Sequence, residues 1–168
     1  MIEIQPIESP EIRIDKDGIW YFRNMEMTRF HIIQYFYKCL HRDRQGRYHI
    51  KTDCDDCLIQ VDDVPFVIKS VSMQLEDDHN QSRMMILLSD GSCEDLKPET
   101  LWIGDNNVMY CLVKQSEHKA RFSRQAYYQL AEYVENDTNH DRYYITIGET
   151  SYTITVKQTD ENGGSNVR

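Results

Sequence analysis

Two stretches of the chain repeat one order of polar and apolar positions. The first opens with Ile14-Asp-Lys-Asp-Gly-Ile-Trp-Tyr21 and closes with Leu58-Ile-Gln-Val61. The second opens with Ile103-Gly-Asp-Asn-Asn-Val-Met-Tyr110 and closes with Thr153-Ile-Thr-Val156. Position 14 corresponds to 103, 29 to 121 and 47 to 142, so the offset grows from 89 to 92 to 95. It changes only between elements, where loops tolerate insertions. The pattern predicts one motif present twice.

Each copy is predicted to contain a hairpin, a helix and a second hairpin. Glu11-Ile-Arg-Ile14 alternates as a half-buried strand does, and Asp17-Gly18 favours a type I′ turn. Thr28 is placed to cap a helix that runs to about His41, and the second helix is expected at about Arg121–Val134. The predicted fold class is α+β, with two similar hairpin–helix–hairpin motifs packed together and a β-meander between them.

The boundaries of these parts follow from the same pattern. We expect the first repeat motif at residues 12–63, a connecting β-meander at 64–100, the second repeat motif at 101–157 and a disordered tail at 158–168. A polar turn is expected at Glu76–Ser82. A duplicated unit usually buries one copy against the other, and the seam between them is a natural place for a ligand.

Composition narrows the class of protein. The hydrophobic fraction of 40% and the charged fraction of 28% are typical of a soluble globular protein. A formal net charge of −9 argues against nucleic-acid binding, which uses clustered lysine and arginine. No apolar run reaches the ~20 residues of a membrane span, and the N-terminus lacks the pattern of a signal peptide. A cytoplasmic protein without membrane or nucleic-acid partners is the expectation.

The five cysteines are predicted to be reduced thiols, because their number is odd and no secretion signal is seen. Cys54-Asp-Asp-Cys57 offers two thiolates, and His49 and Cys39 are candidates to complete a zinc site. A second CxxC is absent, and a redox pair should open a helix, whereas this pair precedes a β-rich run. The favoured interpretation is a hairpin loop with two incidental thiols. Neither a metal nor a cofactor is predicted.

Sequence patterns of catalysis are weak in this chain. It contains no HExxH pair, no nucleophile elbow around a serine and no glycine-rich phosphate loop. The prediction is therefore a protein that binds rather than catalyses. Two alternatives stay open: a metal- or thiol-dependent enzyme that uses Cys54 and Cys57, and a scaffold that forms a homodimer.

The candidate binding residues combine aromatic rings with arginine. Tyrosine supplies contact area and a hydroxyl, and arginine recognises anions. We predict that Arg124 and Tyr128, with Trp20 and Asp63 as neighbours, lie near one concave surface. Pro65 fixes a rigid entry to the next strand and leaves the Asp63 carboxylate available for an arginine.

Several motifs, in order, resemble a proteobacterial family known as domain of unknown function 1285. They comprise Trp20, Arg29, Gly46-Arg-Tyr48, Asp62-Asp-Val-Pro-Phe66 and, late in the chain, Arg124-Gln-Ala-Tyr-Tyr-Gln-Leu130. The resemblance spans roughly residues 12–156. It implies an α+β fold of two similar motifs and a role in ligand binding or signalling. The chain departs from the family at the residues around its CxxC, which argues against a family-wide role for the two cysteines.

The sequence thus predicts a cytoplasmic binding or regulatory module with a role in signal transduction. Its partner would be a small polar or anionic molecule, or a peptide, held between the two repeats. A homodimer is compatible with the same pattern.

Overall fold

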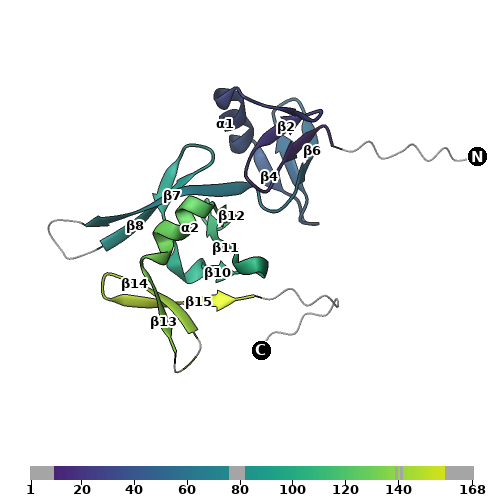
Figure 1. Ribbon diagram of the computed structural model, residues 1–168. Helices are drawn as coiled ribbons and strands as arrows, with labels where there is room; N and C mark the ends of the chain where they lie inside the picture. Colours follow the sequence, from purple (N-terminus) through teal and green to yellow (C-terminus); the bar gives the residue numbers. More distant parts are fainter. Residues whose placement is uncertain (1–9, 76–81, 139, 141, 158–168) are drawn as a thin grey trace, which may run out of the picture. The chain divides into compact units, whose positions relative to one another are not determined.

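The computed structural model describes residues 10–75, 82–138, 140 and 142–157. The chain divides into two units, which we call unit 1 (Met1–Pro65) and unit 2 (Phe66–Arg168), and each is described by itself (Figure 1). The predicted polar turn at Glu76–Ser82 lies almost entirely outside the described residues, and the predicted tail at 158–168 lies wholly outside them. None of the described helices is long and apolar enough to cross a membrane.

The described part of unit 1 holds six strands and one α-helix. In chain order they are β1 (Ile12–Ile14), β2 (Trp20–Phe22), β3 (Met25–Glu26), α1 (Phe30–Lys38), β4 (Leu40–Arg42), β5 (Tyr48–Lys51) and β6 (Asp56–Val61).

The strands of unit 1 form one sheet in the order β3-β2-β1-β6-β5-β4. The two central strands β1 and β6 run parallel, with Ile14 opposite Val61, and the other neighbours are antiparallel. The apolar positions of these strands turn inward and meet Tyr37 of helix α1. The buried core of the unit includes Ile12, Ile14, Trp20, Tyr37, Leu40, Ile50 and Ile59.

The described part of unit 2 contains nine strands, one α-helix and two short 3₁₀ turns. In chain order they are β7 (Phe66–Leu75), β8 (Ser82–Leu88), β9 (Cys93–Asp95), η1 (Pro98–Thr100), β10 (Trp102–Ile103), η2 (Asp105–Asn107), β11 (Met109–Val113), β12 (His118–Phe122), α2 (Arg124–Ala131), β13 (Val134–Asp137), β14 (Arg142–Ile147) and β15 (Thr150–Val156).

The sheet of unit 2 has the order β13-β14-β15-β10-β11-β12-β7-β8-β9. Its first six strands have the strand order of unit 1 read from the other end. Strands β13, β14 and β15 take the places of β4, β5 and β6, and strands β10, β11 and β12 take those of β1, β2 and β3. Three strands precede the helix and three follow it, and the first and last of these run parallel at the centre. Ile103 lies opposite Val156 there, as Ile14 lies opposite Val61 in unit 1.

The predicted fold class is wrong. The described residues are mostly β, with only two α-helices, and they are not a balanced α+β arrangement of hairpins around helices. The strands on either side of each helix join into one continuous sheet, because the first and last strands pair in parallel. The expected meander is also part of a sheet: β7 pairs in parallel with β12 and carries β8 and β9 with it.

Both helices are shorter than predicted, and the paired positions differ at their starts. Phe30 begins α1, whereas Phe122 ends strand β12, so these two residues do not correspond. The residues that precede the helices are Arg29 and Ser123, which are 94 positions apart rather than 92. Ser123 caps α2 by accepting a hydrogen bond from the Ala126 N–H, a contact that the arginine of unit 1 cannot make.

The first hairpin turn forms where it was predicted, but its type differs. Gly18 has φ 78°, while Asp17 is not among the described residues with positive φ, so the turn is not type I′. Asp15 sets the turn instead, because its Oδ1 accepts hydrogen bonds from the N–H groups of Asp17 and Ile19, both at 2.9 Å.

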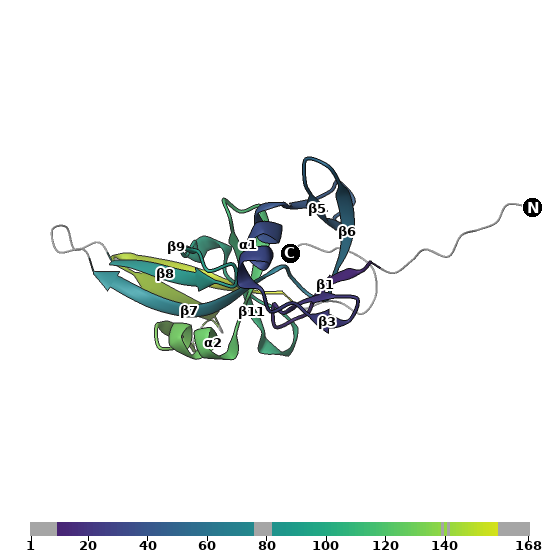
Figure 2. The same cartoon turned by 90° about the horizontal axis from the view of Figure 1, so that it is seen from above.

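Helix α2 is fastened to strand β7, along which it lies in Figure 2. The Ser123 N–H donates to the Ile68 carbonyl at 2.9 Å, and the Val71 N–H donates to Oε1 of Gln129 at 2.8 Å. The β7–β8 register shifts between Ile68 and Ser70. The residue before the helix and a residue of its second turn both form hydrogen bonds with β7. One side of α2 therefore faces the strands, and Leu130 is fully buried on that side.

Candidate functional site

Unit 2 contains a cavity of about 300 Å³ beside helix α2. This volume is at the lower end of the range for sites that bind small molecules. Its wall is formed by the end of α2, strands β10, β11, β13 and β14, and the turn η2. The lining residues are Ile103, Asn107, Met109, Tyr127, Ala131, Val134, Glu135, Asn136 and Tyr143.

Unit 1 shows why this cavity exists. In unit 1, Ile14 of β1 lies opposite Trp20 of β2, and in unit 2 Ile103 of β10 lies opposite Met109 of β11. The two residue pairs occupy equivalent positions in the two sheets. Met109 therefore stands in unit 2 where unit 1 has a tryptophan.

The helices give a second correspondence. The residues that precede them, Arg29 and Ser123, are 94 positions apart. Their last residues, Lys38 and Ala131, are 93 positions apart, and with this offset the buried Tyr37 corresponds to the buried Leu130.

The aromatic pair of unit 1 is missing at the corresponding positions of unit 2, which hold Met109 and Leu130. The rings of Trp20 and Tyr37 pack edge to face with centroids 5.0 Å apart, and both side chains are buried. Met109 is smaller than Trp20 and lines the cavity. The cavity of unit 2 therefore borders the position that Trp20 fills in unit 1.

The lining combines an apolar floor with a polar rim. Met109 is buried, and Tyr127 and Tyr143 add aromatic surface. Glu135 is the charged residue of the lining. Its Oε2 accepts a hydrogen bond from the Tyr144 hydroxyl at 2.9 Å, and this contact, with some burial and the negative charge of Glu135, raises the pKa of Tyr144. The carboxylate is thereby held at the edge of the cavity.

Trp20 and Asp63 of the predicted site belong to unit 1. Trp20 is only 1% exposed and packs against Phe36 and Tyr37, so its ring is part of the core. Asp63 is half-buried. The neighbouring residue Asp62 forms an ion pair in which its Oδ2 lies 2.6 Å from Arg13 Nη1.

Arg124 and Tyr128 belong to unit 2 and lie on the exposed side of helix α2. The guanidinium carbon of Arg124 is 5.9 Å from the ring centroid of Tyr128, whose side chain is 58% exposed. The neighbouring tyrosine, Tyr127, faces the cavity instead. Neither Arg124 nor Tyr128 is in the cavity lining. A surface shared by all four predicted residues stays a prediction.

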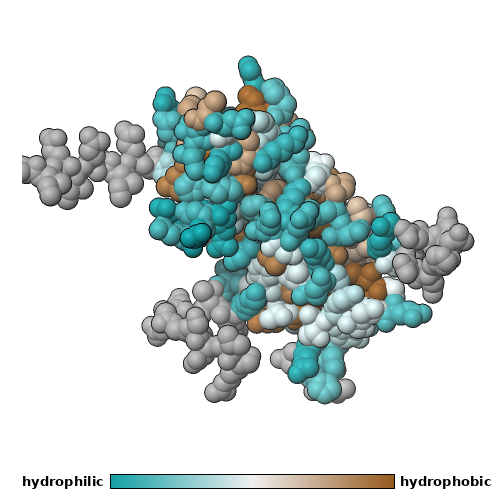
Figure 3. All heavy atoms as spheres, turned by 180° about the vertical axis from the view of Figure 1, so that it is seen from behind, coloured by the Kyte–Doolittle hydropathy of each residue, from teal (hydrophilic) through white to brown (hydrophobic). Residues whose placement is uncertain are grey.

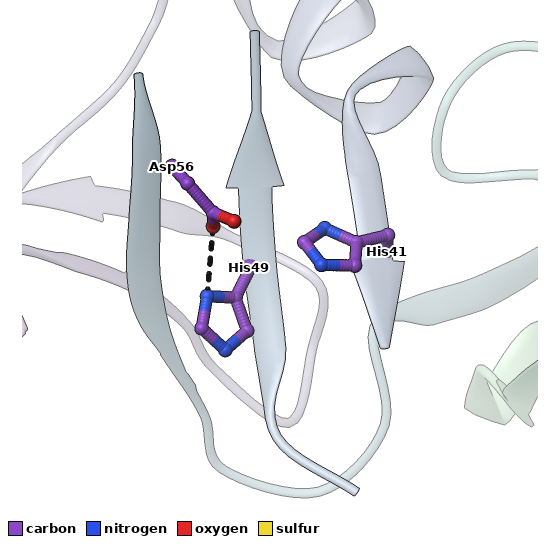
Figure 4. A group of neighbouring side chains, drawn as sticks. All are labelled: His41, His49 and Asp56. Carbon is purple, nitrogen blue, oxygen red and sulfur yellow. Dashed lines mark hydrogen bonds and ion pairs between the residues drawn. The ribbon is translucent and has the colours of Figure 1, made fainter. Parts of the chain in front are cut away.

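Unit 1 carries a cluster of two imidazoles and one carboxylate. His41 of β4, His49 of β5 and Asp56 of β6 each offer a donor atom, and the three atoms lie within 4.8 Å of one another. Figure 4 shows the three side chains gathered over three neighbouring strands. His41 and His49 are directly opposite in the ladder, and Asp56 is two positions from the partner of His49, so the pleat places all three on one face.

His49 is the centre of this cluster. Its Nδ1 lies 2.9 Å from Asp56 Oδ1, and its Nε2 lies 3.3 Å from Asp43 Oδ2. Burial alone would raise the pKa of Asp43, but hydrogen bonds from Arg47, Gln45 and His49 outweigh it and hold the pKa well below its ordinary value. Asp43 is thus an ionised acceptor beside the imidazole.

The two cysteines of the CxxC lie apart from this cluster. Cys57 is next to Asp56 on strand β6, and successive side chains of a strand point to opposite faces. Cys54 is exposed and Cys57 is partly exposed, and both are free thiols. Burial, with the negative charges of Asp55, Glu11 and Asp56, raises the pKa of Cys57.

We expect thiol alkylation of the native protein at neutral pH to proceed in a fixed order. Exposed Cys54 and Cys93 should react first. Cys57 should react several-fold more slowly than Cys54, because its raised pKa lowers the thiolate fraction. Cys111, fully buried and also with a raised pKa, should react last. Peptide mapping after timed quenching measures the order, and equal rates at Cys54 and Cys57 would contradict it.

Some residues of these sites escaped the sequence analysis. The sequence pointed to His49 as a candidate metal ligand, whereas Glu135, Tyr143, His41 and Asp56 were not predicted as site residues. The repeat could have indicated the cavity, because aligning the two copies places Trp20 opposite Met109. The side chain at this core position is smaller in the second copy. For the imidazole cluster, the signal was a histidine on each of two successive short strands.

Comparisons with protein families and with solved structures find proteins that are similar to this chain. Residues 5–64 match the family described as "Domain of unknown function (DUF1285), N-terminal domain". A DUF1285 family protein from Silicibacter pomeroyi DSS-3 has a similar solved structure, with a TM-score of 0.71 and 18% identity over 88% of this chain and 80% of that chain.

A second solved structure is a DUF1285 family protein from Shewanella baltica OS155. It aligns with a TM-score of 0.60 and 17% identity over 73% of this chain and 91% of that chain. At these identities the likeness concerns the fold. No curated protein matches the chain.

Proposed function

We propose that the chain is a binding module that holds a small organic molecule in the cavity of unit 2. The DUF1285 resemblance, which the match over residues 5–64 confirms, concerns a family of unknown function. The observation that carries this proposal is the exchange of Trp20 in the core of unit 1 for the smaller Met109, which lines the cavity of unit 2.

The lining sets the chemistry of the ligand. Met109, Val134 and the two tyrosine rings suit an aliphatic or aromatic body. Glu135 favours a neutral or cationic polar group over an anion, because a carboxylate repels a like charge. The amide side chain of Asn136 offers both a donor and an acceptor. A metabolite with one ring and one amine or hydroxyl group fits this description, as does one side chain of a peptide.

A regulatory role in signal transduction accords with such a module. A ligand that binds one conformation of such a module more tightly than another shifts the population toward the first, and a partner protein can recognise that conformation. The proposal does not require a reaction at the cavity.

The homodimeric scaffold is supported less well. The face of the molecule seen in Figure 3 is dominated by hydrophilic residues, with hydrophobic ones in small separate groups. The net charge of −9 adds repulsion between copies.

The test is to fill the cavity with a large side chain. In Ala131→Tyr, the new ring should fill part of the cavity that Ala131 lines, and the exposed position of Ala131 should let the variant fold. A thermal-shift screen of metabolites, amines and nucleotides on the wild-type protein identifies compounds that raise the melting temperature. We expect Ala131→Tyr to weaken the affinity for such a compound at least about tenfold, or about 1.4 kcal/mol.

Gln125→Tyr is the matched control. It adds the same ring to the same helix at an exposed position outside the cavity lining. It should keep the ligand response of the wild-type protein. Equal ligand responses in Ala131→Tyr and the wild-type protein would refute the cavity as the binding site, and a screen without any stabilising compound would count against the proposed function.

A further inference from the structure

We propose that His41, His49 and Asp56 of unit 1 bind a divalent transition-metal ion such as Zn²⁺. This site is independent of the cavity, because it lies in the other unit and shares no residue with it.

The donor set is the first argument. Two imidazole nitrogens and a carboxylate oxygen are ligands that Zn²⁺ accepts, and three protein ligands leave a fourth position for water or a small anion. The donor atoms lie within 4.8 Å of one another. Tetrahedral zinc with bonds near 2.0–2.1 Å separates its ligands by about 3.3 Å, so side-chain rotations that close the gap by roughly 1–1.5 Å complete the site.

An orphan nitrogen is the second argument. Nδ1 of His41 is buried and has no hydrogen-bond partner among the described residues. A buried polar atom without a partner costs about 1–3 kcal/mol. The ring of His41 stacks near that of His49 with centroids 5.1 Å apart, and Figure 4 shows both rings and the Asp56 carboxylate on the same side of the strands. A metal ion at this place stabilises a ring that the protein alone leaves partly unsatisfied.

The support behind His49 is the third argument. An imidazole that binds a metal through one nitrogen commonly donates its other N–H to a carboxylate. Here Nδ1 of His49 faces Asp56, while Nε2 faces Asp43 at 3.3 Å. Asp43 is itself fixed by the Arg47 side chain and by the N–H groups of Gln45 and Arg47. Asp43 is therefore a positioning residue for the imidazole.

Access from solvent completes the arrangement. The side chain of Asp56 is 48% exposed, whereas that of His49 is 17% exposed. An ion can therefore reach the carboxylate first and then the two rings. The thiol of Cys57 points to the other face of β6 and is not a ligand in this proposal.

Unit 2 lacks such a cluster at the same fold positions. The strand pairings place Glu135 opposite Tyr144 in unit 2, where unit 1 has His41 opposite His49. Ser151 takes the place of Asp56 by the offset of 95 seen along these strands. The proposed site is therefore specific to unit 1, which makes unit 2 an internal reference for the tests.

The experiment is metal titration of the full chain. After removal of metals with a chelator, isothermal titration with Zn²⁺ should show about one site per chain. His41→Gln and His49→Gln should each weaken it at least about 100-fold, and Asp43→Asn should weaken it by about 10–100-fold. Asp56→Asn should also weaken it. Titration with Co²⁺ should give visible ligand-field bands without a thiolate charge-transfer band, because the ligands are nitrogen and oxygen.

Two controls separate this site from other zinc ligands. His140→Gln removes another histidine paired with a carboxylate, Asp137 at 2.7 Å, and should leave zinc affinity unchanged. The double variant Cys54→Ser/Cys57→Ser should also keep it. Loss of zinc in the cysteine variant, unchanged affinity in His41→Gln, or no stoichiometric binding by the wild-type protein would overturn the proposal.

Folding of each variant is followed by circular dichroism and thermal unfolding in the chelator. His41→Gln decides the result if His49→Gln fails to fold, because Nδ1 of His41 has no hydrogen bond to lose. Zinc should raise the melting temperature of the wild-type protein and not that of His41→Gln.

Discussion

Replacing Trp20 with alanine should destabilise the protein by about 4 kcal/mol, the largest single effect that we expect in unit 1. The side chain is 1% exposed and packs against Phe36 and Tyr37. Truncation removes the buried surface of the indole and leaves a cavity at the centre of the unit. Urea unfolding followed by far-ultraviolet circular dichroism measures the loss.

Two further variants isolate the reason. Trp20→Phe should cost much less, about 1–2 kcal/mol, because it keeps an aromatic ring and because Nε1 of Trp20 makes no hydrogen bond within the described residues. Trp102→Ala should also cost less than Trp20→Ala, since Trp102 is only half-buried and stacks on Tyr110 at 5.3 Å. A loss at Trp20 no larger than that at Trp102 would contradict the assignment of Trp20 to the core.

Positions that the sequence aligns between the two copies occupy equivalent places in the two sheets, although the predicted fold class is wrong. Pairing position 14 with 103 and position 61 with 156 matches the parallel pairs Ile14–Val61 and Ile103–Val156. Alternating apolar residues determine these registers, because a shift by one residue would turn each strand over. The patterns therefore identify the strands and the faces that they bury.

The joining of those strands into continuous sheets was not predictable from periodicity. Hairpins are local, whereas the parallel pairing of β1 with β6 joins residues almost fifty positions apart. Long-range pairing leaves no mark on the spacing of apolar residues within either strand. The same reason explains the expected meander, whose first strand pairs with β12 rather than forming a separate layer.

The candidate sites depend on differences between the units, which a single pattern does not reveal. Trp20 was predicted to be a neighbour of the binding residues, yet in unit 1 it fills the core. The informative fact is that the smaller Met109 stands at the corresponding position of unit 2 and lines a cavity. Likewise, the CxxC drew attention to thiols, while the histidines meet only because β4 and β5 pair.

Replacing Asp90 with asparagine should destabilise the protein by about 2 kcal/mol at pH 7. Asp90 follows strand β8, and its side chain is 14% exposed. Oδ2 of Asp90 lies 2.8 Å from the ammonium group of Lys114, and Oδ1 accepts hydrogen bonds from the N–H and the hydroxyl of Ser92. Asparagine keeps some of the hydrogen bonds but loses the charge that Lys114 needs.

The pH dependence of this effect distinguishes a charge from a packing defect. Burial alone would raise the pKa of Asp90, but the hydrogen bonds and the charge of Lys114 lower it below the ordinary value. A carboxylate whose pKa is depressed in the folded state stabilises that state at pH values above the unfolded pKa of about 3.9. The contribution is lost as pH falls through the lower, folded pKa. The difference between wild type and Asp90→Asn should therefore shrink below about pH 4.

Asp95→Asn is the control for this measurement, because its ion pair is exposed. Oδ2 of Asp95 lies 3.9 Å from Arg83, and the two side chains are 54% and 49% exposed. Exposed pairs contribute little, so this variant should change the free energy of unfolding by less than about 0.5 kcal/mol at pH 7. Urea unfolding at pH 7 and near pH 3 compares both variants with the wild-type protein. A loss in Asp90→Asn that persists undiminished in acid would show that the charge of Asp90 is not its cause.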